Sequence, residues 1–407
     1  MACNRLGKWN TSRRPVTEPL ELWLRVRGFR HAPPQNVTYL APEGQCDRST
    51  GAGCMRIAAH TKDLPSLYLA VAVETPPDAR CSMRPLPSGD EAGIRPSTVA
   101  ELPALRMRYV SRMDRTAQVT KAGDGRTVMF AEWGDLDGKP VFALHGTPGC
   151  RLDRHPNEDL VRSTGARVIT YDRAGYGGSD RHGGRAVADC VGDVVAVADA
   201  LGLDRFAVMG SSGGGPHALA VAALLGDRVT RVICIVGLAP YEALGDDWFA
   251  GMDPENVKEF GWALEGEARL ARELEHESEK LREIASVDPS AILGQFDLPP
   301  SDKEVLARED FAQVLRESIV EQTRNGVWGW VDDDIAFIQP WGFDPATITV
   351  PTQVWYGTSD VLVPPAHGEW IARTVPGAVV RLNALGHMGD PDADRVESLA
   401  WLTAATG

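Results

Sequence analysis

The sequence predicts an α/β protein built on a doubly wound sheet of parallel strands. The first observation is a set of short apolar runs, typical of buried parallel strands, at 141–144, 167–171, 206–209, 232–236, 353–356 and 379–382. The second is that helical stretches, among them 187–201 and 216–225, lie between several of these runs. Such alternation is typical of sheets with helices on both faces. The third is the composition, since 407 residues with 43% hydrophobic and 24% charged residues can build a large core.

Residues 1–105 lack this alternation, and we expect them to form a poorly ordered N-terminal extension. They hold 12 of the 28 prolines, which interrupt nearly every candidate element. The run 67–73 could still form a strand, so a small folded module is the alternative. Residues 1–115 carry 17 Lys and Arg against 11 Asp and Glu. These charges are dispersed and not interleaved with aromatic residues, so no nucleic-acid partner is predicted.

The α/β core is expected to consist of residues 116–240 and 346–407. It begins with a hairpin over 117–133, whose two strands flank the turn Gly123-Asp124-Gly125. The alternation of strands and helices stops near Pro240 and resumes near Thr349. The intervening residues, 241–345, are rich in helix formers, so we expect a helical lid inserted between two strands.

A nucleophile is predicted from Gly210-Ser211-Ser212-Gly213-Gly214, a G-x-S-x-G sequence between the strand 206–209 and a helix that starts near Pro216. A serine on such a turn exposes its Oγ at the edge of the sheet, and small flanking residues suit the strained backbone. Ser212 is therefore the candidate nucleophile. A flexible phosphate-binding loop is the alternative, but neither G-x-G-x-x-G nor a G-K-[ST] ending is present.

A serine hydroxyl needs a base, and His387 is the candidate among nine histidines. It follows the last predicted strand, where a loop can bring the imidazole over the sheet edge. Asp360 follows the strand 353–356 and is the candidate acid, which would orient His387 and stabilise its protonated form. Asp246 and Asp247, shortly after the strand 232–236, are the alternatives for the acid.

The oxyanion that develops during acyl transfer needs two N–H donors. The segment His145-Gly146-Thr147-Pro148-Gly149 follows the strand 141–144. We expect the N–H of Thr147 to be one donor and the N–H of Gly213 to be the other. Because only the backbone of Thr147 would act, its side chain is expected to matter little. His145 is expected to orient the loop rather than to act as a base.

Together these segments resemble the α/β-hydrolase superfamily, in its branch with a serine nucleophile and an inserted helical lid. The resemblance covers about residues 116–405 and rests on 145–149, the turn 172–179 (DRAGYGGS), 210–214, Asp360 and His387. It implies a mostly parallel eight-stranded sheet, a cap over the active site and no cofactor. Ser212 stands where epoxide hydrolases and haloalkane dehalogenases have aspartate, so those activities are not expected. Gly213 stands where proline iminopeptidases have the tryptophan of G-G-S-W-G, which leaves a peptidase activity open.

The acidic charge of the predicted lid argues against some classes of substrate. It carries 25 acidic and nine basic residues, a charge that disfavours polyanions such as acyl-CoA thioesters and nucleic acids. Trp328 and Trp330 are candidate pocket residues, with an acidic rim formed by Asp332, Asp333 and Asp334. Such a pocket would suit a small neutral or cationic molecule with a hydrophobic group.

The sequence thus predicts a cofactor-free serine hydrolase that cleaves a small, largely apolar ester or amide through an acyl-enzyme on Ser212. One alternative is a carbon-carbon bond hydrolase or perhydrolase that uses the same triad. A second is an aminopeptidase similar to proline iminopeptidases. A third is a ligand-binding receptor without catalytic activity.

No metal site, secretion signal or membrane span is expected. The seven cysteines include no C-x-x-C pair and no Cys/His spacing typical of zinc. The apolar runs fall far short of the roughly 18 residues of a membrane helix, and the N-terminus has no apolar h-region. We therefore expect a soluble, cytoplasmic protein that acts on a small molecule, and the sequence leaves its oligomeric state open.

Overall fold

Contacts divide the chain into two units, Met1–Arg106 and Met107–Gly407. The computed structural model describes residues 38–40, 52–61, 64–74, 115–287 and 296–405. In the first unit, an antiparallel sheet has the order β1-β2-β3, formed by Thr38–Leu40, Ala52–Thr61 and Leu64–Glu74. The run 67–73, which the sequence left open as a strand, lies within β3. The rest of the predicted extension lies outside the described residues.

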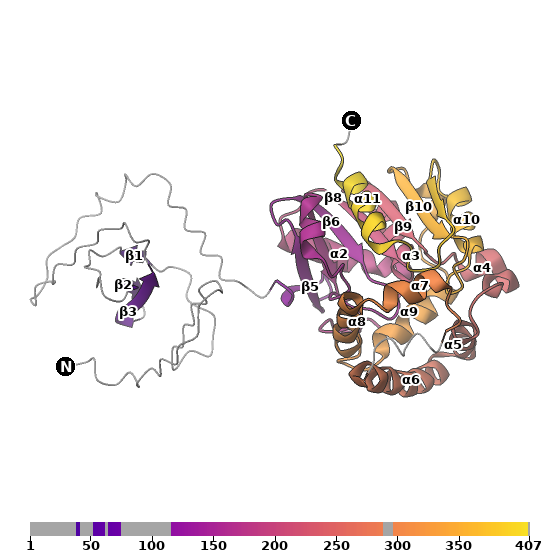
Figure 1. The fold of residues 1–407 in the computed structure, drawn as a ribbon, viewed down its shortest axis with the longest axis horizontal. Helices are drawn as coiled ribbons and strands as arrows, with labels where there is room; N and C mark the ends of the chain where they lie inside the picture. Colours follow the sequence, from indigo (N-terminus) through magenta and orange to yellow (C-terminus); the bar gives the residue numbers. More distant parts are fainter. Residues whose placement is uncertain (1–37, 41–51, 62–63, 75–114, 288–295, 406–407) are drawn as a thin grey trace, which may run out of the picture. The chain divides into compact units, whose positions relative to one another are not determined.

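The second unit is built around an eight-stranded sheet in the order β11-β10-β9-β8-β6-β7-β5-β4 (Figure 1). In chain order the strands β4 to β11 are Gln118–Lys121, Thr127–Gly134, Lys139–Leu144, Ala166–Tyr171, Phe206–Ser211, Val229–Ile235, Thr352–Gly357 and Val379–Asn383. Strands β6 to β11 pair in parallel, whereas β5 is antiparallel to β7 and β4 is antiparallel to β5. The predicted, mostly parallel eight-stranded sheet is confirmed.

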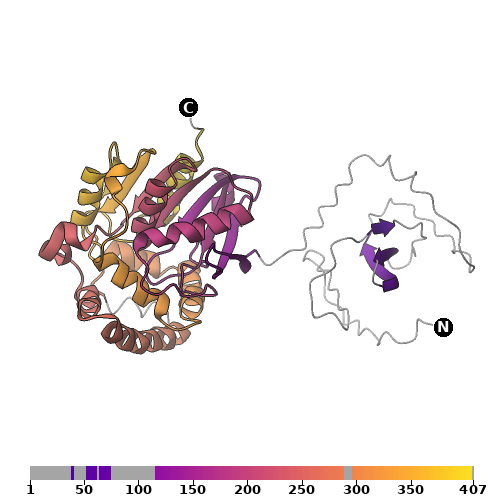
Figure 2. The same cartoon turned by 180° about the vertical axis from the view of Figure 1, so that it is seen from behind.

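Helices cover both faces of this sheet, as Figures 1 and 2 show from opposite sides. One face packs against α1 (Glu158–Ser163) and α11 (Pro391–Thr403), and the other against α2 (Cys190–Ala200), α3 (Gly214–Leu224) and α10 (Pro365–Thr374). Alternate residues of a strand enter different cores. In β8, Val208 packs with α2 and α3, and Met209 packs with α1 and α11. The doubly wound arrangement is therefore confirmed.

Between β9 and β10 the chain leaves the sheet and forms a set of helices. They are α4 (Tyr241–Leu244), the 3-10 helix Gly245–Phe249, α5 (Pro254–Glu265), α6 (Glu267–Val287), α7 (Pro300–Leu306), α8 (Glu309–Gln322) and α9 (Trp328–Ile338). We call residues 241–345, which contain them, the insertion. In Figure 1 the helices α5, α6, α8 and α9 lie together below the sheet. Trp248, Leu274 and Phe337 are buried in the same core as α2 and α3, so the insertion packs onto the sheet layer.

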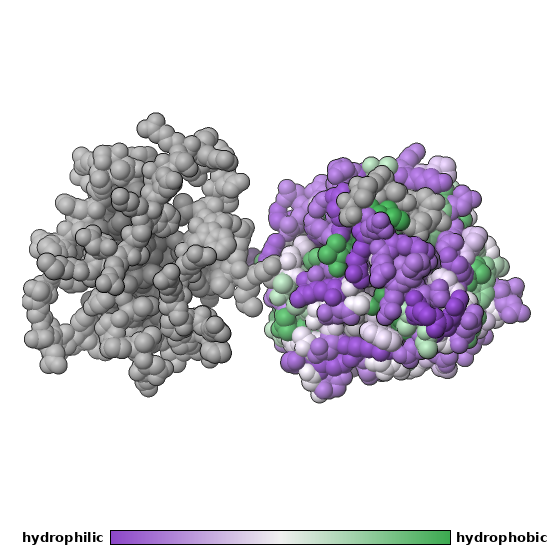
Figure 3. Space-filling view, turned by 90° about the horizontal axis from the view of Figure 1, so that it is seen from below, coloured by the Kyte–Doolittle hydropathy of each residue, from purple (hydrophilic) through white to green (hydrophobic). Residues whose placement is uncertain are grey.

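Helix α6 has a buried apolar face and an exposed acidic face. Leu270 and Leu274 are buried, whereas Glu267, Glu275 and Glu279 are exposed. Figure 3, which views the molecule from below, shows hydrophilic side chains over most of the visible face of the second unit. Although α6 has 21 residues, it is too polar to cross a membrane, and no other helix in the described ranges has the length and apolar character for it.

A chain that begins at Met107 is expected to keep the thermal unfolding midpoint of the full-length protein. The reason is that the unit Met107–Gly407 contains the complete eight-stranded sheet and the cores on both of its faces. Differential scanning calorimetry of the two chains checks this. A fall of more than about 3 °C, on the order of 1 kcal/mol for a domain of this size, would show that the first unit stabilises the second.

Candidate active site

Ser212 occupies a sharp turn between β8 and α3, at the carboxyl end of β8. Its φ of 54° lies in the left-handed region, which costs a residue with a Cβ about 1 to 3 kcal/mol. Two backbone hydrogen bonds hold the turn: Ser212 N donates to Ile235 O (2.9 Å), and Gly215 N donates to Ser212 O (2.8 Å). Position 210 must be a glycine for steric reasons, because a Cβ there would collide with the carbonyl of Gly214. The turn therefore has the geometry that the G-x-S-x-G sequence predicts.

His387 and Asp360 meet at the ends of β11 and β10. His387 Nδ1 donates to Asp360 Oδ2 at 2.8 Å. The other oxygen of Asp360 accepts from the N–H groups of Leu362 and Val363, each at 2.9 Å, so the carboxylate is fixed on both sides. This arrangement leaves Nε2 of His387 free to accept a proton. The alternative acids, Asp246 and Asp247, are exposed in the 3-10 helix Gly245–Phe249.

The pKa of His387 depends on its burial and on the carboxylates beside it. Burial by itself would lower the pKa of His387, but the charge of Asp360 and its hydrogen bond outweigh burial, so the pKa lies above its usual value. The charge of Asp302 acts in the same direction. The structure thus stabilises the imidazolium form of His387.

The two predicted oxyanion donors lie side by side near Ser212. Gly213 precedes the first turn of α3, and a Cβ at Gly213 would collide with the side chain of Thr147. A Cβ at Gly146, the residue before Thr147, would lie 3.6 Å from the Cβ of Ser212. The loop after β6 and the start of α3 therefore approach the serine together, as an oxyanion hole requires.

Ser212 and His387 line one cavity of about 760 Å³. Apolar side chains from the insertion form part of its wall, among them Trp262, Leu281, Phe311, Leu315, Ile319 and Trp330. Glu255, Glu259 and Glu277 also line it. Among the described residues, no group of three or more His, Cys, Asp or Glu side chains is placed to hold a metal ion. The cavity therefore offers an apolar wall with carboxyl groups beside a serine and a histidine.

Two expectations about this cavity need correction. Trp330 lines it, but Trp328 does not: the guanidinium of Arg181 lies over the ring of Trp328, 3.9 Å from its centroid. The second expectation is an acidic rim formed by Asp332, Asp333 and Asp334. All three residues are buried, so they form no such rim. Asp332 pairs with Arg181, and Asp333 pairs with Arg173 and Arg185. The carboxyl groups at the cavity are instead those of the three glutamates.

The whole arrangement, a serine on a strand-to-helix turn with a His-Asp pair at the ends of later strands, can be compared with known proteins. The sequence model of the alpha/beta hydrolase fold matches residues 139–391, more than half of the chain. The chain belongs to this family.

Curated relatives match shorter parts of this chain. A non-heme chloroperoxidase of Streptomyces lividans is 34% identical over 143 residues, which are 35% of this chain and 52% of that protein. A proline iminopeptidase of Xanthomonas citri is 35% identical over 108 residues, 25% of this chain and 34% of that protein. A bifunctional esterase/perhydrolase of Acinetobacter calcoaceticus is 33% identical over 122 residues, 29% of this chain and 43% of that protein. This chain thus spans about half or less of the length of these relatives.

Solved structures share the fold of this chain. A hydrolase from Pseudomonas aeruginosa PA01 aligns with a TM-score of 0.53 at 21% identity, over 71% of this chain and 98% of that chain. A bromoperoxidase from Bacillus anthracis aligns with a TM-score of 0.50 at 22% identity, over 70% of this chain and 98% of that chain. These likenesses show the fold alone.

Two further buried residues, Asp302 and Arg173, hold the loops of the candidate site. The carboxylate of Asp302, in α7, accepts from the N–H groups of His387 (2.8 Å) and Met388 (3.1 Å). Arg173 donates through Nη2 to the carbonyl of Gly146 (2.7 Å). Arg173 lies within the turn 172–179, one of the segments that carry the family resemblance, whereas Asp302 belongs to no pattern that could have singled it out.

We expect Asp360→Asn to lower kcat for ester cleavage by up to about 10⁴ and His387→Ala to lower it at least as much. The reason is that the base transfers the proton, whereas the acid only supports the base. Steady-state kinetics with p-nitrophenyl esters check this. Near-full activity of Asp360→Asn, together with loss of activity in Asp246→Asn or Asp247→Asn, would overturn the choice of acid.

The pH profile of Asp360→Asn tests the same assignment electrostatically. In the wild-type chain, kcat/KM for ester cleavage should fall as the pH drops through the raised pKa of His387, because a protonated imidazole cannot accept the serine proton. Removing the charge of Asp360 lowers that pKa, so the acid limb should move to lower pH. An acid limb that does not move would mean that it reports another group.

Proposed function

We propose that the chain is a cofactor-free serine hydrolase that cleaves a small, largely apolar ester or amide. The observation that carries the proposal is the His387–Asp360 hydrogen bond of 2.8 Å, which leaves Nε2 of His387 free in the cavity that Ser212 also lines. A nucleophile, a base and an orienting acid are the groups that acyl transfer needs.

The reaction would proceed in two halves. Ser212 Oγ attacks the carbonyl carbon while His387 Nε2 takes the serine proton, and the N–H groups of Thr147 and Gly213 donate to the developing oxyanion. The carbonyl re-forms as the bond to the leaving group breaks, and His387 passes the proton to that group. Water then attacks the acyl-enzyme with His387 again as base, which releases the acid and restores Ser212.

The cavity supports the substrate class. Its volume of about 760 Å³ and its apolar wall of Trp262, Phe311 and Trp330 suit a small hydrophobic acyl or leaving group. The helices of the insertion supply that wall, so the insertion would act as a lid over the site. The relative named as an esterase/perhydrolase is consistent with an ester substrate. If hydrogen peroxide replaced water in the second half, the same acyl-enzyme would yield a peracid.

A fluorophosphonate probe is expected to label the wild-type chain at Ser212 and to leave Ser212→Ala unlabelled. The probe forms a covalent bond only with a serine that a base activates. Gel fluorescence followed by peptide mass spectrometry checks the site. Ser211→Ala is the matched control, since Ser211 precedes the nucleophile in the same turn and should not prevent labelling. A folded wild-type chain that is not labelled would contradict the proposal and favour a ligand-binding receptor.

An aminopeptidase is the second candidate, and the carboxyl group of Glu259 favours it. Glu259 lines the cavity and accepts from Trp330 Nε1 at 2.8 Å. Burial raises the pKa of Glu259 above its usual value, and the ionised form of the group would attract an ammonium group. The match to a proline iminopeptidase is consistent with this candidate.

Glu259→Gln separates the two candidates. For an aminopeptidase, the variant should lose about tenfold or more in kcat/KM for aminoacyl-naphthylamides, because a charge-assisted contact to the substrate amine is worth about 1.5 to 3 kcal/mol. Its kcat/KM for p-nitrophenyl acetate, which has no amine, should stay unchanged. Equal kinetics of wild type and variant on both substrates would remove the second candidate.

A further inference from the structure

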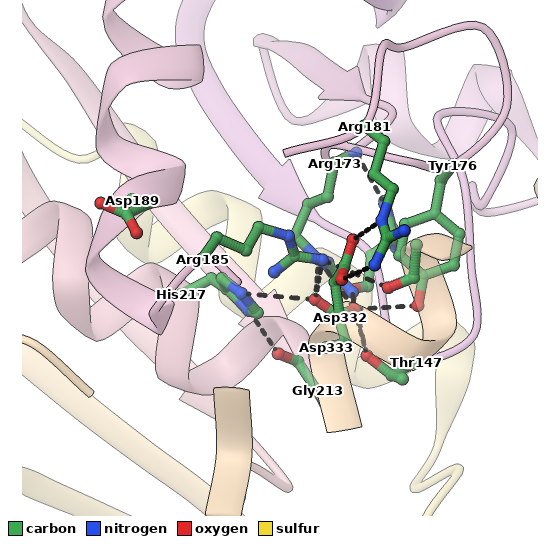
Figure 4. Close-up of polar contacts among 12 residues, drawn as sticks. Thr147, Arg173, Tyr176, Arg181, Arg185, Asp189, Gly213, His217, Asp332 and Asp333 are labelled. Atoms are coloured by element: carbon green, nitrogen blue, oxygen red, sulfur yellow. Dashed lines mark hydrogen bonds and ion pairs between the residues drawn. The ribbon is translucent and has the colours of Figure 1, made fainter. Parts of the chain in front are cut away.

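One carboxylate of helix α9 is shared by several side chains of the sheet domain (Figure 4). Asp333 is 0% exposed. Its Oδ2 accepts from Thr147 Oγ1 (2.7 Å) and Tyr176 Oη (2.9 Å), and it pairs with Arg173 Nη2 (2.5 Å). Its Oδ1 pairs with Arg185 Nη2 at 2.6 Å. Burial would raise the pKa of Asp333, but the two guanidinium groups outweigh burial and hold the pKa well below its usual range, so the group is ionised.

The partners of Asp333 hold the loop that carries the first oxyanion donor. Arg173 donates to the carbonyls of His145 and Gly146, the two residues before Thr147, and its backbone N–H donates to His145 Nε2 at 3.2 Å. Asp333 fixes the guanidinium that makes these bonds and also binds the side chain of Thr147 directly. The direction of the Thr147 N–H is therefore set from helix α9. The expectation that this side chain matters little overlooks the hydrogen bond.

The second donor is held from the same side. A Cβ at Gly213 would meet the side chain of Thr147 and would lie 3.1 Å from Cζ of Phe337, which is also on α9. The carbonyl of Gly213 accepts from His217 Nδ1 at 2.7 Å, and His217 Nε2 lies 3.6 Å from Asp333 Oδ1. Helix α9 thus contacts the residues of both N–H donors, whereas Asp360 and His387 lie on other elements.

We propose that Asp333 is a positioning residue that holds the oxyanion hole in its working geometry, so that transition-state stabilisation depends on the seating of helix α9. The inference rests on the proposed acyl transfer at Ser212. A donor misplaced by about 1 Å can cost about 10²-fold in rate, and a buried carboxylate with four partners restricts such movement. Asp333 does not line the cavity, so its effect would pass through Thr147 and Arg173.

Thr147→Val and Thr147→Ser test the link with the least disturbance. Valine keeps the shape and the backbone N–H but loses the hydrogen bond to Asp333, whereas serine keeps the hydroxyl. We expect Thr147→Val to lower both the second-order rate constant of fluorophosphonate labelling and kcat for a p-nitrophenyl ester by about 10- to 100-fold. KM should change less than about threefold, and Thr147→Ser should restore most of the rate. The labelling rate per reactive site is independent of the fraction of folded protein.

Asp333→Asn and Asp332→Asn form the matched pair on the helix. Both carboxylates are buried, and Asp332 pairs with Arg181 Nη2 at 2.9 Å but does not reach the oxyanion loop. Asp333→Asn should lower the labelling rate at least as much as Thr147→Val. Asp332→Asn should leave the rate per site unchanged, whatever it does to the thermal midpoint. Should Asp333→Asn fail to fold, the two Thr147 variants still decide.

Failure of the inference differs from failure of the proposed function. Wild-type rates in Thr147→Val, or an equal loss in Asp332→Asn and Asp333→Asn, would overturn the role of Asp333 while Ser212 remains the nucleophile. A folded wild type that is neither labelled nor active on esters would overturn the proposed function and this inference with it.

Discussion

The ion pairs of Asp333 with Arg173 and Arg185 are the contacts on which the assembled site depends. A charge taken out of water costs several kcal/mol unless opposite charges and hydrogen-bond donors meet it. Here the carboxylate comes from the insertion between β9 and β10, whereas both guanidinium groups come from the chain between β7 and α2. Neither side is satisfied without the other. The sheet domain and helix α9 must therefore adopt one mutual arrangement, which also fixes the loop after β6.

Most of the fold and the core of the candidate site could be predicted because their signals are local. Apolar runs bounded by turns mark buried parallel strands, and the carboxyl ends of such strands meet at one edge of the sheet. Ser212, Asp360 and His387 follow β8, β10 and β11, so their separation in the chain does not hide their proximity. The strained turn at Ser212 has its own glycine signature. His387 and Asp360 form a hydrogen bond, as their positions after neighbouring parallel strands predict.

The insertion was less predictable because its side chains find partners far away in the sequence. Successive residues of an α-helix are about 100° apart, so Trp328 and Trp330 point in different directions, and only Trp330 reaches the cavity. A run of three aspartates suggests exposure by composition, yet Asp332 and Asp333 each meet arginines from before α2. Asp302 has no sequence signal at all, because its partners are backbone N–H groups of the loop after β11.

Asp302 and Asp333 give the insertion two anchors in the candidate catalytic machinery. One carboxylate holds the backbone of His387, and the other holds the loop of Thr147. The helices that shape the pocket are therefore not an interchangeable module. A chimera that took residues 241–345 from a relative would alter the pocket wall and remove both anchors in a single step. Its inactivity would carry no information about substrate fit unless the graft preserved the two carboxylates in place.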